Sequence, residues 1–250
     1  MPPEVAAPGP GVAVPNLGAG EQRAEKSLQM SSPLRLDPNT KLENWPDFPE
    51  SEISSGTRAS IGHRWVDDQK TGLSVGIWEA EPNLGRWMKW PVHEFMVVLD
   101  GEVVMVEEDR ETVVAKGECF YIPKGRRCIW NQAVYFKKLM MIFDDRSGAH
   151  ADETLPIRKI ELGEMSGAPE CFRDPTGRFT AGLRRMDRDL RKSQGGDTTE
   201  LIYLLTGSMT YIGNGETISF RAGEAYLSLP GSTGTWAASR AAGAVYCAFR

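Results

Sequence analysis

The side chains that most often ligate metals or act as nucleophiles are few in this 250-residue sequence. Its histidines are His63, His93 and His150, and its four cysteines show no C-x-x-C spacing. Neither set has the donor clustering that a zinc or iron site needs. Cys128, taken as a nucleophile, would need a neighbouring base, and no histidine is expected on its face of a strand. The residue types therefore give little support to thiol or metal chemistry.

Composition excludes several classes of protein. Lys and Arg total 29 against 34 Asp and Glu, with a net charge of −5 and no basic block, so nucleic-acid binding is not expected. The apolar run at residues 95–99 is far shorter than the ~20 residues of a membrane-spanning helix. The apolar fraction of 40% is typical of globular chains. Four cysteines without a disulfide framework favour a reduced, cytoplasmic protein.

The elements that would position any site are strands. Short β-branched or aromatic runs occur at residues 73–78, 95–99, 102–107, 112–115 and 119–122, bounded by Gly or Pro. Helical periodicity is scarce. The pattern predicts an all-β sandwich or barrel.

An internal repeat organises the chain, since landmarks coincide when the sequence is shifted by 106 residues. Many of them are glycines of the kind that turns require. The coincident landmarks are Gly76/Gly182, Leu84/Leu190, Glu94/Glu200, Leu99/Leu205, Gly101/Gly207, Gly117-Glu118/Gly223-Glu224, Gly125/Gly231, Trp130/Trp236 and Phe143/Phe249. The chain is therefore predicted to hold two copies of one all-β unit.

The predicted boundaries follow from the repeat and from composition. Residues 1–44 are expected to be a disordered arm, 45–146 the first unit, 147–176 a linker and 177–250 the second unit. The first 20 residues hold 5 Pro, 4 Gly and 4 Ala, and no aromatic residue precedes Trp45. Such a segment cannot bury enough surface to offset its ordering entropy. It also lacks the basic start and apolar run of a signal peptide.

Two motifs carry a resemblance to a known superfamily. One is a Glu followed seven residues later by Gly, and the other is Gly, five residues, Pro, one residue, Gly. They are met by Glu94 and Gly101, by Glu200 and Gly207, and by Gly117, Pro123 and Gly125; the second copy keeps Gly223 and Gly231 but has its proline one place late, at Pro230. The sequence thus resembles the cupin superfamily. Its segments GIWEAEP, HEFMVVLDGEV and GECFYIPKGRRCIW look more narrowly like the (S)-ureidoglycine aminohydrolase cupin family. The resemblance implies two tandem jelly-roll barrels, a bicupin.

The resemblance also implies a metal, held by two His spaced H-x-H, the motif Glu and a later His, but these histidines are missing. The H-x-H positions hold Met88 and Trp90, or Trp87 and Lys89, and the later position holds Cys128. The second copy has Gln194 and Gly196, or Ser193 and Gly195, and then Gly234. Each barrel keeps one carboxylate, too few donors for a divalent ion. We predict no metal and no cofactor in either barrel.

His93 does not fill the gap. It is adjacent to Glu94, and neighbouring strand residues point to opposite faces of a sheet. If Glu94 points into the barrel, His93 points out, where it is expected to be a surface or subunit-contact residue.

The predicted binding site is the lumen of the first barrel, in which other side chains take the positions of the missing metal ligands. Its members are Trp78, Trp87, Lys89, Glu94, Arg126, Cys128 and Trp130, with Met88 and Trp90 as the alternative to Trp87 and Lys89. Aromatic walls with a few polar groups are usual for small-molecule sites. Glu94 could serve as a general base if burial raised its pKa, and Lys89 or Arg126 could anchor an anion.

Each of these residues also has a structural interpretation. Trp130 and Trp236 recur in both copies and could plug the barrel ends, while Cys128 could be a small core residue. In the second barrel, the small residues either empty the pocket or let it collapse. The basic stretch near it could bind an anion or form a solvated face; its members are Arg184, Arg185, Arg188, Arg191 and Lys192.

Three functions remain in competition. The leading hypothesis is metal-independent binding of a small polar metabolite in the first barrel. One alternative is an enzyme of ureide or nitrogen-compound metabolism with Glu94 as base, and the other is a structural or assembly protein with filled barrels. A homodimer is expected because sheet edges gain from pairing. No nucleic-acid or membrane partner is expected.

Overall fold

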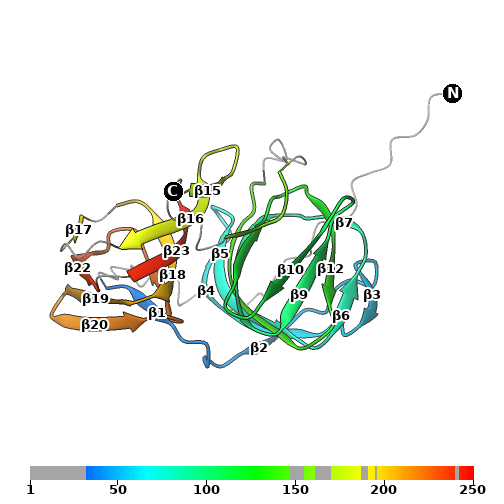
Figure 1. Cartoon of the computed structure of the whole chain (residues 1–250), viewed down its shortest axis with the longest axis horizontal. Coiled ribbons are helices and arrows are strands. Elements are labelled where there is room, and N and C mark those ends of the chain that lie inside the picture. The colour runs from blue at the N-terminus through cyan, green and yellow to red at the C-terminus, as the bar shows by residue number, and fades with distance from the viewer. Residues whose placement is uncertain (1–31, 147–154, 161–169, 187–190, 195, 240–241) are drawn as a thin grey trace.

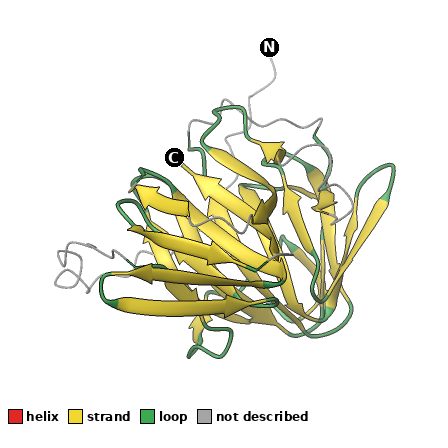
Figure 2. Cartoon of the chain, turned by 60° about the vertical axis from the view of Figure 1, so that its left-hand side comes forward, coloured by secondary structure: helices red, strands yellow, loops and turns green. Residues whose placement is uncertain are grey.

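The computed structural model describes residues 32–146, 155–160, 170–186, 191–194, 196–239 and 242–250. All regular structure in this part of the chain is β-strand (Figure 2), arranged as two barrels side by side (Figure 1). The all-β, tandem-barrel prediction is confirmed. No helix in these ranges is long and apolar enough to cross a membrane.

The first barrel, on the right of Figure 1, has a seven-stranded sheet facing a smaller one. The large sheet runs in the order β14 (Arg158–Ile160), β11 (Cys119–Ile122), β8 (His93–Asp100), β13 (Phe136–Phe143), β5 (Leu73–Ala80), β4 (Ser60–Asp68) and β2 (Glu43–Trp45). The facing sheet runs in the order β10 (Glu111–Ala115), β9 (Glu102–Val106), β12 (Arg127–Gln132), β6 (Asn83–Gly85) and β3 (Ile53–Gly56), and β7 (Met88–Lys89) also pairs with β12.

The second barrel, on the left of Figure 1, repeats this plan. Its six-stranded sheet runs in the order β1 (Leu34–Leu36), β21 (Ala225–Ser228), β18 (Thr199–Thr206), β23 (Ala242–Phe249), β16 (Phe179–Met186) and β15 (Glu170–Arg173). The facing sheet runs in the order β17 (Arg191–Gln194), β22 (Thr233–Ala238), β19 (Ser208–Gly213) and β20 (Glu216–Arg221).

Strand registers confirm the repeat residue by residue. Glu94 lies opposite Ile142 between β8 and β13, and Glu200 lies opposite Ala248 between β18 and β23, with every number raised by 106. Even the irregularity recurs: the register of β13 on β8 shifts at Lys137/Lys138, and that of β23 on β18 shifts at the equivalent place. The two units are copies at the level of backbone pairing.

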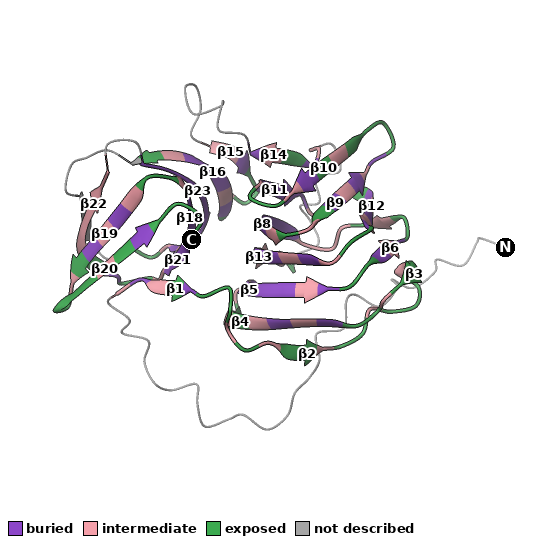
Figure 3. Cartoon of the chain, turned by 60° about the horizontal axis from the view of Figure 1, so that its bottom comes forward, coloured by how far each residue is buried: buried purple, intermediate pink, exposed green. Residues whose placement is uncertain are grey.

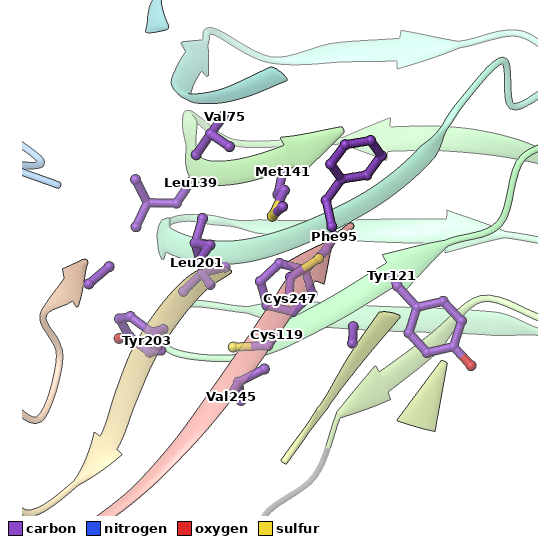
Figure 4. Close-up of a cluster of buried hydrophobic side chains, with 14 of the residues drawn as sticks. Val75, Phe95, Cys119, Tyr121, Leu139, Met141, Leu201, Tyr203, Val245 and Cys247 are labelled. Carbon is purple, nitrogen blue, oxygen red and sulfur yellow. The ribbon is translucent and has the colours of Figure 1, made fainter. Parts of the chain in front are cut away.

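The two large sheets pack against each other through their outer faces. Figure 4 shows side chains from both barrels meeting in one cluster, with Phe95 and Met141 on one side and Leu201 and Val245 on the other. The central strands are therefore buried on both faces, toward the lumen and toward the other barrel (Figure 3). This explains the continuous apolar run of β8, because a strand buried on both faces need not alternate with polar residues. By contrast, β9 alternates, since one of its faces meets solvent.

His93 lies in this contact between the barrels, and the surface or subunit prediction is wrong. The residue does face away from the lumen, as alternation predicted, but its side chain is fully buried. Its ring lies among those of Phe143, Phe172 and Phe179 at centroid distances of 5.5–6.3 Å. Nδ1 accepts a hydrogen bond from the Lys124 amide at 3.2 Å, while Nε2 has no partner. The expectation failed because the partner surface belongs to the same chain.

The predicted arm and linker both contain strands. Residues 32–44 of the arm are not disordered: β1 pairs with β21 of the second barrel, and β2 pairs with β4 of the first. In the linker, β14 extends the first barrel, and β15 extends the second from before residue 177. Backbone pairing with existing sheet edges orders these segments, which a composition-based reading cannot detect. Residues 1–31, 147–154 and 161–169 lie outside the described ranges.

Leu36 provides a test of the β1 contact. Its side chain is buried in the cluster between the barrels although it precedes both of them in sequence. Leu36→Ala is expected to lower the free energy of unfolding by about 2–4 kcal/mol, because it leaves a cavity in a packed site. The exposed Lys41→Ala on the following segment is the control and should stay within about 0.5 kcal/mol of the wild type in urea unfolding. If Leu36→Ala lowered the free energy of unfolding no more than Lys41→Ala does, packing of the Leu36 side chain of β1 would add no stability.

Candidate functional site: the two barrel interiors

Glu94 is held by two groups of its own barrel. It lies on β8 with its carboxylate almost wholly buried. Oε1 accepts a hydrogen bond from Lys138 Nζ at 2.8 Å, and Oε2 accepts one from Trp90 Nε1 at 3.1 Å. Burial of a carboxylate is costly unless it is paired, and these contacts supply the pairing. Nothing in this arrangement favours Glu94 as a general base.

Lys138 is the residue that sequence reasoning missed. It lies on β13 directly across from Trp78 of β5, with its side chain inside the barrel. Nζ lies 5.0 Å from the Trp78 ring centroid and 4.7 Å from that of Trp130, which is cation–π geometry. Met96 Sδ is 3.3 Å from the same nitrogen. A signal was present, because Lys138 shares the face of Met140 two residues further along the strand.

Aromatic rings pack around this ion pair. Trp90 stacks on Trp130 at 6.0 Å and 21°, and Trp78 meets Trp130 edge-on at 6.2 Å. Cys128 is fully buried in the same cluster, and burial, the largest effect, raises its thiol pKa to about 12. A thiol with such a pKa is a small core residue rather than a nucleophile. The structure therefore brings Trp78, Glu94, Cys128 and Trp130 together, but as packed neighbours.

Trp87 and Lys89 do not join them. Trp87 is 42% exposed with the Arg127 guanidinium 5.5 Å from its ring, and the Lys89 side chain is exposed as well. Lys89 lies opposite Arg127 on β12, whereas Met88 lies opposite the buried Cys128. The alternative assignment was the better one, since Trp90 packs against the lumen cluster.

The remaining predicted residue, Arg126, forms part of a network at the edge of the first barrel. The buried Glu107 carboxylate accepts hydrogen bonds from Arg126 Nε, from Arg110 Nε at 2.6 Å and from the Ile157 amide at 3.2 Å. Arg110 in turn donates to the Ile157 carbonyl at 2.7 Å. Ile157 itself belongs to the lumen cluster. Arg126 thus helps to hold a segment of the predicted linker against the first barrel.

The metal that the cupin resemblance implies does not fit these residues. Where a cation would meet the motif glutamate, the Lys138 ammonium is already at hydrogen-bond distance from Glu94. Among the described residues, no group of three or more His, Cys, Asp and Glu lies close enough to hold an ion. The aromatic rings around the carboxylate supply no further donor of the kind that transition metals require.

In the second barrel, Glu200 takes the place of Glu94 and pairs with an arginine. Arg184 of β16 donates from both terminal nitrogens to the two carboxylate oxygens, at 2.9 and 2.5 Å. Its guanidinium lies 4.5 Å from the Tyr246 ring centroid. Burial acts to lower the Arg184 pKa, but the hydrogen bonds and charge of Glu200 outweigh it and raise that pKa above its usual value.

This end of the second barrel holds a cavity of about 310 Å³. Its charged lining consists of Glu170, Arg173, Arg178, Arg184, Glu200 and Arg250. Hydroxyl groups line it as well, from Thr180, Thr198, Ser228 and Ser232. Arginine side chains therefore outnumber carboxylates, and the surface is polar. Residue 195 and residues 187–190, which include part of the predicted basic stretch, lie outside the described ranges.

Smaller residues than those of the first barrel account for this space. Gly196 stands at the position of Trp90, Ser228 at that of Ile122 and Ala248 at that of Ile142, and all three line the cavity. The backbone equivalence is direct, because Gly125 donates to the Trp90 carbonyl and Gly231 donates to the Gly196 carbonyl. Of the two outcomes expected for the small residues of the second barrel, an emptied or a collapsed pocket, this side shows the emptied one.

On the other side the barrel has collapsed instead. Gly234 stands at the position of Cys128, and an added Cβ there would lie 2.2 Å from the Tyr211 ring. Tyr211 fills that space, donating its hydroxyl to the Thr233 carbonyl at 2.5 Å. Its ring also meets Trp236 edge-on at 5.1 Å.

Two arginines of the cavity wall have no aspartate or glutamate partner among the described residues. Arg173 is paired with Glu170 by bonds of 2.8 and 2.5 Å, as Arg184 is with Glu200. Arg178 instead lies over the rings of Phe143 and Phe249, and its Nε donates a hydrogen bond to the main-chain oxygen of Arg250 at 3.1 Å. Neither Arg178 nor Arg250 makes an ion pair with an aspartate or glutamate of the described ranges. These two guanidinium groups are the natural anchors for an anion.

Comparison with known proteins supports the cupin assignment. Residues 68–139 match the family described as the EutQ-like cupin domain. No curated protein matches the chain. The fold is similar to a solved protein of unknown function from Pseudomonas syringae pv. tomato, with TM-score 0.59 and 15% identity over 87% of this chain and 99% of that one.

Two further solved structures share the fold. Protein Ylba from E. coli has TM-score 0.54 and 11% identity over 86% of this chain and 90% of that one. A cupin 2 conserved barrel domain protein from Leptotrichia buccalis has TM-score 0.53 and 12% identity over 79% and 91%. Similarity at this level of identity extends to the fold and leaves the ligand open.

Proposed function

We propose that this chain, a protein of the cupin superfamily, binds a small anionic metabolite without a metal, in the cavity of the second barrel. The observation that carries the proposal is the cavity of about 310 Å³ whose wall holds four arginines and two glutamates. Guanidinium groups match carboxylate and phosphate oxygens in two-pronged hydrogen bonds. A cavity of this size lies at the small end of the range for metabolite sites.

The proposal places the metabolite site in the second barrel, whereas the site predicted from the sequence is in the first. The sequence favoured the first barrel, but its lumen cluster is filled by Trp78, Trp130, Cys128 and the Glu94–Lys138 pair. That filling supports a structural role for the first barrel, in line with the hypothesis of filled barrels. The ureide enzyme hypothesis receives no support from the geometry, because Glu94 is paired on both oxygens.

A thermal-shift screen of carboxylates and phosphates tests the proposal. A ligand at 100 times its Kd stabilises the native state by about 2.7 kcal/mol, which corresponds to a rise in Tm of roughly 5–10 °C for a chain of this size. The shift should persist after treatment with a metal chelator. It should be largely lost in Arg178→Gln, which removes an arginine without leaving a glutamate unpaired.

Arg185→Gln is the matched control. Arg185 follows Arg184 on β16 but its side chain is exposed and does not line the cavity. This variant should keep the full ligand-induced shift. A shift that Arg178→Gln retains, or that the chelator removes, would contradict the proposal.

We carry the expected homodimer forward as a second proposal. The outer faces of the two large sheets are already used between the barrels, so a dimer would form through sheet edges such as β20. Light scattering should then give twice the chain mass of 27.7 kDa. A mass of one chain at micromolar concentration would refute it.

A further inference from the structure

We propose that the first barrel is still a cation site, and that its ligand is the ammonium group of the chain's own Lys138. In this view, the barrel has kept the acidic centre of the fold and replaced the metal by an organic cation tethered to β13. The chemical class that the site accepts is a primary alkylammonium. This inference is independent of the function proposed for the second barrel.

The contacts around Nζ are those of an ammonium site. The nitrogen is 2.8 Å from Glu94 Oε1 and lies at 5.0 and 4.7 Å from the ring centroids of Trp78 and Trp130. A carboxylate with aromatic faces is the arrangement by which proteins recognise organic ammonium ligands. Both charged side chains are buried, with 8% and 4% of their surfaces exposed, so the attraction is screened little by water.

The strand register and the neighbouring tryptophans position the cage around the lysine ammonium. Trp78 lies directly across from Lys138 on the neighbouring strand, and its ring centroid is 5.0 Å from Nζ. Trp90 donates to the second oxygen of Glu94 and stacks on Trp130, so that the carboxylate is fixed in orientation. The cage is thus built by four residues of three different strands and one loop.

The second barrel supports the inference independently, because its motif glutamate is also paired with a cation, which comes from a different strand. Its residue equivalent to Lys138 is Ala244, and the cation comes instead from Arg184, which lies directly across from Ala244 on β16. Arg184 occupies the position equivalent to Trp78 and pairs with Glu200. Two copies that share neither the strand nor the residue type of the cation have both placed one on the motif glutamate. What is common is the positive charge itself.

Chemical rescue tests the site directly. Lys138→Ala removes the side chain beyond Cβ, and n-propylammonium has the three carbons and one ammonium nitrogen that are lost. The variant is expected to melt about 10 °C below the wild type, because Glu94 is left buried without its partner. Saturating n-propylammonium is expected to restore at least half of this loss. It should leave the Tm of the wild type unchanged.

Two controls distinguish the effect of the ammonium charge from that of filling the cavity left by the side chain, and from that of losing any lysine of β13. Neutral n-propanol has the same size as the ammonium and should restore less than about a quarter of the Tm loss. Lys137→Ala removes the neighbouring lysine, whose ion pair with Glu79 at 2.9 Å lies on the other face of β13, and should cost about 2 °C or less. Equal rescue by n-propanol, or a Lys138→Ala variant as stable as Lys137→Ala, would overturn the inference.

A second pair of variants applies if Lys138→Ala does not fold. Lys138→Met keeps the length of the side chain and removes its charge, and the double variant with Glu94→Gln removes both charges. The double variant is expected to melt at least about 5 °C above the single one, since no unpaired carboxylate remains. A double variant no more stable than Lys138→Met would show that the site does not depend on the cation, and would overturn the inference.

Discussion

Replacing Gly101 with alanine is expected to destabilise the protein by about 3 kcal/mol or more, whereas the same change at Gly117 should cost about 1–2 kcal/mol. Both glycines have left-handed backbone angles, with φ of 77° and 86°. They differ in the space beside them. A Cβ at Gly101 would lie 1.9 Å from the Tyr135 carbonyl oxygen, and one at Gly117 would meet nothing within 4 Å.

The repeat supplies a second, independent pair for this experiment. At Gly207, the equivalent of Gly101, a Cβ would lie 2.5 Å from Ser239 Oγ and 2.7 Å from the Ala242 Cα, while Gly223 is open like Gly117. In urea unfolding, the alanine variants of the two crowded glycines should therefore lose more free energy of unfolding than those of the two open ones. If all four cost the same, backbone angle alone would determine the effect, and the crowding argument would be wrong.

Acidification is expected to weaken the contact between the two barrels through His93. Burial, the largest effect, lowers the pKa of this imidazole, while Asp174 and Asp145 act to raise it and Lys124 to lower it, and the net result lies below the usual value of 6.5. The unfolded chain then binds a proton that the folded chain does not. Stability from this source is complete above pH 6.5 and is lost as the pH falls below it, by at most about 1.4 kcal/mol per pH unit.

The contribution of His93 is isolated by a variant that cannot titrate. His93→Phe keeps a ring among Phe143, Phe172 and Phe179 but loses the acceptor of the Lys124 amide. The loss of this hydrogen bond lowers the free energy of unfolding of the variant by a similar amount at every pH, because residue 93 no longer titrates. The difference in free energy of unfolding between wild type and variant should shrink as the pH is lowered from 7.5 to 5. A constant difference would mean that His93 keeps its ordinary pKa in the folded protein.

Much of the architecture could be predicted from the sequence because the repeat consists of residues, such as turn glycines, whose roles depend on the local backbone. Turn glycines such as Gly101 and Gly207 need left-handed backbone angles that few other residues adopt, so they remained aligned. The alternation of Met140 and Met141 between lumen and interface likewise follows from strand geometry alone. The absence of histidines from the motif positions was visible in the same way.

The interior of each barrel was harder to predict, because it depends on which strands meet. Lys138 lies far from Glu94 in sequence, and only the pairing of β13 with both β5 and β8 brings it beside Trp78 and the carboxylate. Trp87 and Lys89 were assigned to the lumen because the choice of face on so short a strand as β7 cannot be made from alternation. The burial of His93 required knowing that the two sheets face each other within one chain.

The position of β1 has a consequence for the order in which the protein can fold. Leu34 pairs with Leu227 and Leu36 with Ala225, so one of the earliest described segments needs one of the latest to complete its sheet. During synthesis the first barrel can close as soon as its own strands have left the ribosome, but β1 has to wait unpaired until β21 emerges. We therefore expect the docking of β1 to be among the last steps of folding, and nascent chains stalled before residue 225 to expose Leu36 to proteases.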